Sequence, residues 1–138
     1  MGRAILGVLA GLVAMFLVIM GIEYVGHMVY PPPPGLNPMV TEDLAAIMAS
    51  QPAAAKAFVV VAWVVGAFIG GWVAARISRS YPRAAAVIVA LMVVAGVVGM
   101  ILQLPGHPRW MAALGLLLPI PAALLGARLV RPRPATRA

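Results

Sequence analysis

Residues 53–76 read AAAKAFVVVAWVVGAFIGGWVAAR, an apolar run with one lysine near its start and one arginine at its end. A helix needs about 20 apolar residues to cross the hydrocarbon core of a bilayer. Three further runs meet this length, at about 4–30, 84–104 and 110–130. None of the four alternates apolar and polar residues as the strands of a membrane barrel do. The sequence therefore predicts an all-α, polytopic membrane protein in which residues 1–138 form one four-helix transmembrane bundle.

The composition supports lipid as the surrounding medium. Hydrophobic residues make up 64% of the chain and charged residues 9%, whereas a soluble domain carries about 25% charged residues. The net charge of +7 comes mainly from arginines between and after the apolar runs. This pattern fits anionic lipid headgroups better than nucleic acid. The bilayer is the expected partner, nucleic-acid binding is not expected, and the lack of cysteine excludes disulfides and thiolate metal sites.

The placement of arginines predicts the direction of the spans. The clusters contain Arg3 before the first run, Arg76, Arg79 and Arg83 between the second and third, and Arg128, Arg131, Arg133 and Arg137 at the end. The opposite loops carry only Lys56 and Arg109 as cations. Short loops rich in Lys and Arg stay cytoplasmic. Both termini, including a basic tail at 131–138, are therefore expected in the cytoplasm, and the first run is expected to be a retained span rather than a signal peptide.

Residues 31–52 form the one long loop, which is expected on the outer side. It opens with Pro31–Pro34, which cannot continue a helix and favours polyproline II. Thr41 is placed to cap a short helix that has two acidic residues in its first turn. The apolar face of this helix carries Leu44, Ile47 and Met48. We expect a stiff connector with a short helix over the bundle or on the membrane surface; a lid or partner-docking element is the alternative.

The second run carries small residues at every fourth position, which places them on one helix face. They are Ala62, Gly66, Gly70 and Ala74, and Gly71 belongs to a second row beside them. Small side chains let helix backbones approach closely, and this packing drives helix association in lipid. Two uses stay open: packing within one chain, and a seam between two copies.

Two prolines near the middle of the fourth run predict a kink. Pro119 and Pro121 each lack the N–H that closes a helical turn. The carbonyls left free need another donor, because lipid supplies none. The kink is expected to be static rather than a hinge.

The polar residues of the spans fall near the expected outer ends. The set is Glu23, Tyr24, His27, Gln103, His107 and Arg109. Glu23 and His27 are four positions apart and share a helix face. Ionisable residues within a span are functional candidates, and two histidines with a carboxylate also match the ligand preferences of Zn²⁺ or Fe²⁺. Three uses stay open: structural pairing at the interface, a proton or ligand site, and a metal site of Glu23, His27 and His107.

Three motifs give the chain a resemblance. They read IEYVGH at 22–27, YPPPPG at 30–35 and WVVGAFIGG at 63–71, followed by AAR at 74–76. In this pattern the chain resembles small four-span membrane proteins of bacteria that have no assigned activity, which implies a bacterial plasma membrane. Four short spans with a glutamate in the first are also similar to small multidrug-resistance transporters. The glutamate of those transporters lies near mid-membrane, whereas Glu23 is expected near the outer end.

The sequence offers no catalytic set. Ser78 and Ser80 are expected on the opposite side of the membrane from both histidines, and no Gly-rich phosphate loop is present. We therefore expect a non-enzymatic membrane protein without a cofactor, structural or accessory, that associates with itself or with another membrane protein. The alternatives are a small proton- or cation-coupled transporter that uses Glu23 and His27, and a metal-binding membrane protein.

Overall fold

The computed structural model describes residues 2–104 and 106–130, so the basic tail expected at 131–138 lies outside the described residues. The described chain is helical between short loops. Its elements are α1 (Gly2–Val29), α2 (Thr41–Ser50), α3 (Ala53–Ile77), α4 (Pro82–Gln103), α5 (Arg109–Leu117) and α6 (Pro119–Arg128). Helices α1, α3 and α4, and the continuous stretch of α5 and α6, are long and apolar enough to cross a membrane. The predicted all-α bundle of four spans is confirmed, with boundaries that differ by one or two residues.

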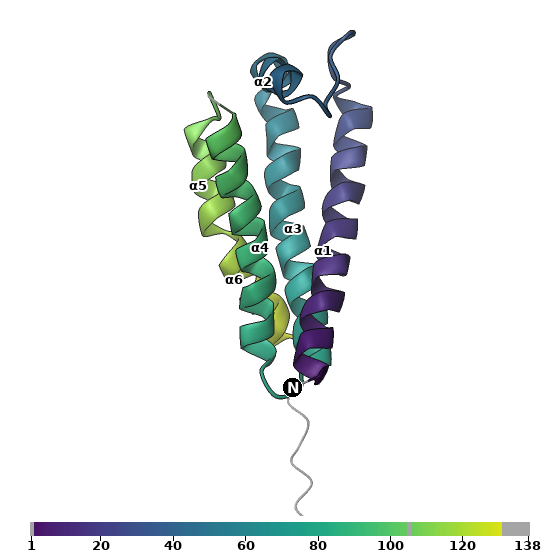
Figure 1. The fold of residues 1–138 in the computed structure, drawn as a ribbon, viewed down its shortest axis with the longest axis vertical. Helices are drawn as coiled ribbons and strands as arrows, with labels where there is room; N and C mark the ends of the chain where they lie inside the picture. The colour runs from purple at the N-terminus through teal and green to yellow at the C-terminus, as the bar shows by residue number, and fades with distance from the viewer. Residues whose placement is uncertain (1, 105, 131–138) are drawn as a thin grey trace, which may run out of the picture.

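Helix α3 lies at the centre of the bundle (Figure 1). Helix α1 packs along one side of α3, while α4 and α6 pack against its other sides. Helix α2 lies across one end of the bundle, above the start of α3, and we call this the loop end. The opposite end carries the start of α1 and the turn between α3 and α4. We call it the arginine end, after Arg3, Arg76, Arg79, Arg83 and Arg128.

Prolines mark where four of the helices begin. Pro52 and Pro108 directly precede the first residues of α3 and α5, and Pro82 and Pro119 stand in the first turns of α4 and α6. Proline is favoured at these positions because the first N–H groups of a helix have no partner within it. The short helix α2 begins at Thr41, but Val40 precedes it and no side chain caps it. The expected cap at Thr41 is therefore wrong, because Thr41 is itself the first helical residue.

The fourth span is divided at Leu118, next to the two prolines. Leu118 still donates to the carbonyl of Leu114 at 3.0 Å and accepts from the N–H of Ala122 at 3.0 Å. The hydrogen-bond ladder thus continues through the break, and α5 and α6 follow one another as one span. The interruption is local, because Pro119 and Pro121 remove only two donors from the ladder.

Both rows of small residues on α3 are used inside the chain. A β-carbon at Gly70 would lie 2.7 Å from the carbonyl oxygen of Gly11 on α1, so the two backbones are in contact there. On the second row, a β-carbon at Gly71 would lie 2.7 Å from the Cα of Ala123 on α6. The first row of Ala62, Gly66, Gly70 and Ala74 is buried in the same way. The structure therefore assigns these rows to packing within one chain, and no small-residue face of α3 is left for a seam between copies.

The outside of α1 is covered by large apolar side chains. Exposed members include Ile5, Leu9, Val13, Phe16, Leu17 and Met20. Only 17% of the most apolar window of α1 is buried in the bundle. A soluble monomer rarely exposes so large a continuous apolar surface. Lipid is the medium that such a surface requires.

Candidate functional site

The structure divides the polar residues that the sequence singled out. Glu23 and His27 lie near the end of α1, whereas His107 lies in the turn between α4 and α5. Figure 1 shows these two places on opposite sides of α3 at the loop end. Gln103 and Arg109 border the same turn as His107, and Tyr24 is 68% exposed on the outside of α1. The six polar residues therefore lie in separate places, and Glu23 and His27 remain a pair with new neighbours.

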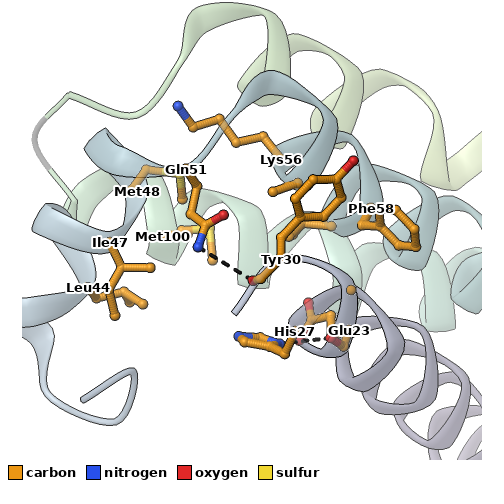
Figure 2. Close-up of a pocket in the computed structure, with 13 residues that line it drawn as sticks. Glu23, His27, Tyr30, Leu44, Ile47, Met48, Gln51, Lys56, Phe58 and Met100 are labelled. Carbon is orange, nitrogen blue, oxygen red and sulfur yellow. Dashed lines mark hydrogen bonds between the residues drawn. The ribbon is translucent and has the colours of Figure 1, made fainter. Parts of the chain in front are cut away.

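Those neighbours form a cavity of about 160 Å³ beneath α2 (Figure 2). It is bounded by the end of α1, by α2, by the start of α3 and by Met100 of α4. Its apolar wall includes Leu44, Ile47, Met48, Phe58, Val59 and Met100. Its polar members are Glu23, His27, Tyr30, Gln51 and Lys56. The loop end thus holds an apolar pocket with a small polar group on one side.

One hydrogen bond of His27 decides whether its other ring nitrogen, Nε2, donates or accepts. Nδ1 of His27 lies 2.7 Å from the backbone oxygen of Glu23. A carbonyl oxygen only accepts, so Nδ1 carries the proton and donates. In the neutral ring Nε2 is then an acceptor. No described residue donates a hydrogen bond to the carboxylate of Glu23, which leaves a second acceptor at the same place.

Gln51 adds a third acceptor by the same reasoning. Its Nε2 donates to the carbonyl oxygens of Pro31 at 3.1 Å and Tyr30 at 3.5 Å. Both partners are acceptors, which leaves Oε1 of Gln51 as an unused acceptor. Figure 2 shows the amine of Lys56 pointing away from Glu23 and His27. The free hydrogen-bonding groups of the carboxylate, the imidazole and the amide are therefore all acceptors.

Helix α2 is held over the cavity by contacts at both of its ends. Before its start, the N–H of Asn37 donates to Asp43 Oδ2 at 2.9 Å. After its end, Gln51 ties the chain to the end of α1 through the two bonds above. Ile47 in the middle of α2 is 8% exposed and faces the cavity. The apolar face predicted for this helix is thus the roof of the pocket.

An aromatic pair lines the cavity beside α1. The rings of Tyr30 and Phe58 meet edge to face, with centroids 6.0 Å apart. A β-carbon at Gly26 would lie 3.3 Å from Cβ of Phe58, so the absence of a side chain at Gly26 lets the ring lie against α1. Sequence reasoning did not place Tyr30, Phe58, Gln51, Lys56 or Met100 at a site. The one pattern in the sequence that could have indicated the pocket was the apolar face of α2, because an apolar helix face packs against another apolar surface.

In the part of the chain that the structure describes, two buried polar side-chain atoms lie outside this cavity and lack a hydrogen-bond partner. One is Nε2 of His107, whose Nδ1 lies 3.2 Å from the carbonyl oxygen of Pro108. The other is the hydroxyl of Ser78 at the arginine end, in a side chain that is 0% exposed. Among the described residues, no group of three or more His, Cys, Asp or Glu side chains is placed to hold a metal ion. Glu23, His27 and His107 in particular do not converge.

Comparison with known proteins gives no relative to argue from: no protein-family model, no curated protein and no solved structure matches this chain.

Proposed function

We propose that this chain is a non-enzymatic membrane protein that binds a small amphiphilic molecule with a protonated amine in the cavity beneath α2. The observation that carries the proposal is the character of the cavity. It is about 160 Å³ in volume and its walls are mostly apolar. The groups left free on Glu23, His27 and Gln51 are acceptors, and the ammonium of Lys56, which also lines the cavity, points away from Glu23 and His27.

The volume sets the size of the apolar part of the ligand. An apolar cavity of about 150 Å³ is large enough to hold benzene. A cavity of about 160 Å³ therefore takes a group of that size or a short alkyl chain. Transfer of this group from water to apolar walls stabilises the complex in proportion to the buried area.

The acceptors set the chemistry of the head group. An ammonium group offers three donors and a positive charge, which the carboxylate of Glu23 complements. A charge-assisted hydrogen bond of this kind is roughly twice as strong as a neutral one. His27 and Gln51 line the same cavity and offer Nε2 and Oε1 as further acceptors. An alcohol makes only part of this set, and a carboxylate ligand is repelled by Glu23.

The position of the cavity supports access from the membrane surface. The arginine end carries most of the cations, so we place it in the cytoplasm and the loop end outside, in a bacterial plasma membrane. An amphiphile in the outer leaflet then has its polar head at the depth of Glu23. Association with itself or with a partner protein would have to use surfaces other than the small-residue rows, which are buried within the chain.

The test is calorimetric titration of the purified chain in nanodiscs, with empty nanodiscs as the blank. The ligands are hexylammonium, hexanol and hexanoate, which share one alkyl chain. We expect hexylammonium to bind most tightly. In Glu23→Gln its affinity should fall tenfold or more, since hydrogen bonds to charged groups contribute about 1.5–3 kcal/mol. Equal binding of all three ligands, or no change in the variant, would contradict the proposal.

Glu42→Gln is the matched control. Glu42 is an exposed carboxylate on α2 and does not line the cavity. The same neutralisation there removes the same charge from the same end of the protein. Affinity for hexylammonium should stay unchanged. A loss equal to that in Glu23→Gln would show that the effect is general surface electrostatics.

A second candidate is a small transporter in which Glu23 and His27 relay a proton or carry a cation. It is favoured by their position at one cavity and by the division of the fourth span at Leu118. The test is uptake of a hydrophobic cation into proteoliposomes under a proton gradient. The Glu23→Gln variant should abolish the uptake, and an unchanged flux removes this candidate.

A further inference from the structure

A second hollow lies at the arginine end, far from the cavity beneath α2. It is a groove of about 410 Å³ between the starts of α1 and α4. Its walls include Ala4, Ile5 and Leu9 of α1, Tyr81 just before α4, and Ala84 and Ile88 of α4. From Tyr81 to Ile88 the groove follows α4 for about 10 Å, at about 1.5 Å per residue. It is about 10 Å long and apolar, which suits part of an extended hydrocarbon chain.

Positive charge surrounds the mouth of this groove. Arg3 and Arg83 are exposed, and each directly precedes a residue of the wall, Ala4 and Ala84. Both α1 and α4 also begin at this end. The start of a helix carries a partial positive charge and N–H groups without partners within the helix. In α4 no side chain caps these groups. The mouth is therefore complementary to an anion.

The floor of the groove supplies an independent polar observation. Ser78 lines the groove, its side chain is 0% exposed, and its hydroxyl has no partner among the described residues. A buried polar group without a hydrogen bond is unfavourable, because it has lost its water and gained no partner. An acceptor oxygen brought into the groove relieves this cost. Tyr81, at the mouth, is 64% exposed, and tyrosine favours the headgroup level of a membrane.

We propose that this groove binds one anionic phospholipid, with an acyl chain between α1 and α4 and the phosphate held by Arg3 and Arg83. The positive charge at the mouth favours an anionic lipid over a neutral lipid. The apolar walls favour a lipid over a free anion, because a free anion has no apolar surface to bury there. The ester oxygens of the glycerol are the acceptors nearest the floor, where Ser78 offers a donor. The site is independent of the cavity beneath α2, since the two share no residue.

The test is native mass spectrometry of the full chain released from detergent, with three additions compared. They are phosphatidylglycerol, phosphatidylcholine with the same acyl chains, and inorganic phosphate. We expect one phosphatidylglycerol per chain to stay bound, with much weaker retention of phosphatidylcholine and no displacement by phosphate. Equal retention of both lipids would overturn the proposal. Displacement of phosphatidylglycerol by inorganic phosphate would overturn the proposal that the groove holds its acyl chain.

Charge variants test the mouth of the groove. In Arg3→Gln/Arg83→Gln the affinity for phosphatidylglycerol should fall about thirtyfold, which is about 2 kcal/mol at about 1.4 kcal/mol per tenfold change. Arg109→Gln, at the loop end, is the control and should bind as the wild type does. An equal loss in the control would show attraction to the protein as a whole rather than to this site.

A bulky variant tests the groove itself. Ala84→Phe fills it from the wall of α4. Ala84 is exposed, so the ring needs no space in the core. Ala95→Phe makes the same change at another exposed position of α4, outside the groove. Retention of phosphatidylglycerol should be lost in the first variant and kept in the second. Full retention in Ala84→Phe would refute the placement of the acyl chain.

Discussion

Replacement of Gly70 by alanine tests whether the small residues of α3 hold α1 in place. The new β-carbon would lie 2.7 Å from the backbone oxygen of Gly11 and 2.8 Å from Cβ of Met15. Neither atom can rotate away, because one belongs to the backbone and the other is fixed to it. To restore an ordinary contact of 3.4 Å, α1 must move by about 0.7 Å away from α3. A gap of this size along a packed interface forfeits roughly a quarter to a half of each dispersion contact.

The expected cost follows from two opposing effects. Overpacking of a well-packed core destabilises by about 1–3 kcal/mol. Alanine is a better helix former than glycine by about 1 kcal/mol, which offsets part of this cost. Gly96 on α4 provides the matched control, because a β-carbon there meets nothing within 4 Å. Gly96→Ala should therefore be neutral or slightly stabilising. Gly70→Ala gains the same helix propensity but is overpacked, so it should be less stable than Gly96→Ala by about 1–3 kcal/mol.

The assay is equilibrium unfolding of both variants in mixed detergent micelles by added sodium dodecyl sulfate. Helicity by circular dichroism and tryptophan fluorescence are followed together. The quantity compared is the free energy of unfolding of each variant minus that of the wild type. If Gly70→Ala were as stable as Gly96→Ala, the close approach of α1 and α3 would not exist in the protein. The assignment of the small-residue rows to packing within one chain would then fail.

Three further outcomes are expected from other parts of the structure. Gln51→Ala removes both bonds that tie the end of α2 to α1. At about 1 kcal/mol per bond, backbone amides at 41–50 should exchange hydrogen roughly thirtyfold faster, with α3 unchanged as the internal control. Gly115→Ala places a β-carbon 2.6 Å from the ring of Trp63 and should weaken the near-ultraviolet circular dichroism of tryptophan; an unaltered spectrum would mean that the two are not in contact. Single cysteines introduced at Met39 and Ser80, which lie at opposite ends of the bundle, should react with an impermeant maleimide from opposite sides of the membrane, and labelling from one side would show that the spans do not cross it.

The candidate site was predictable only in part. Glu23 and His27 were found from their spacing, because residues four apart on a helix share a face whatever the rest of the fold does. Their neighbours were not found. Gln51 reaches the carbonyl of Tyr30 across 21 positions of sequence. That contact depends on the loop folding back over α3, which no local pattern encodes. The sequence left open whether His107 lies beside Glu23, because nearness to one end of the bundle does not decide the side of the bundle.

The number of spans and the apolar medium follow from sequence alone. Each span is a local property: about 20 apolar residues in a row make a helix long enough to cross a bilayer, independently of its neighbours. Which surface each helix face contacts is not a local property of the sequence. Whether Gly70 contacts α1 of the same chain or of another copy depends on how the four spans pack in three dimensions. The hydrophobic effect does not favour one contact over the other, because lipid is as apolar as the helix surfaces. Only the tertiary structure decided that α3 is central, that both of its small faces are covered, and that α2 closes a cavity over Glu23.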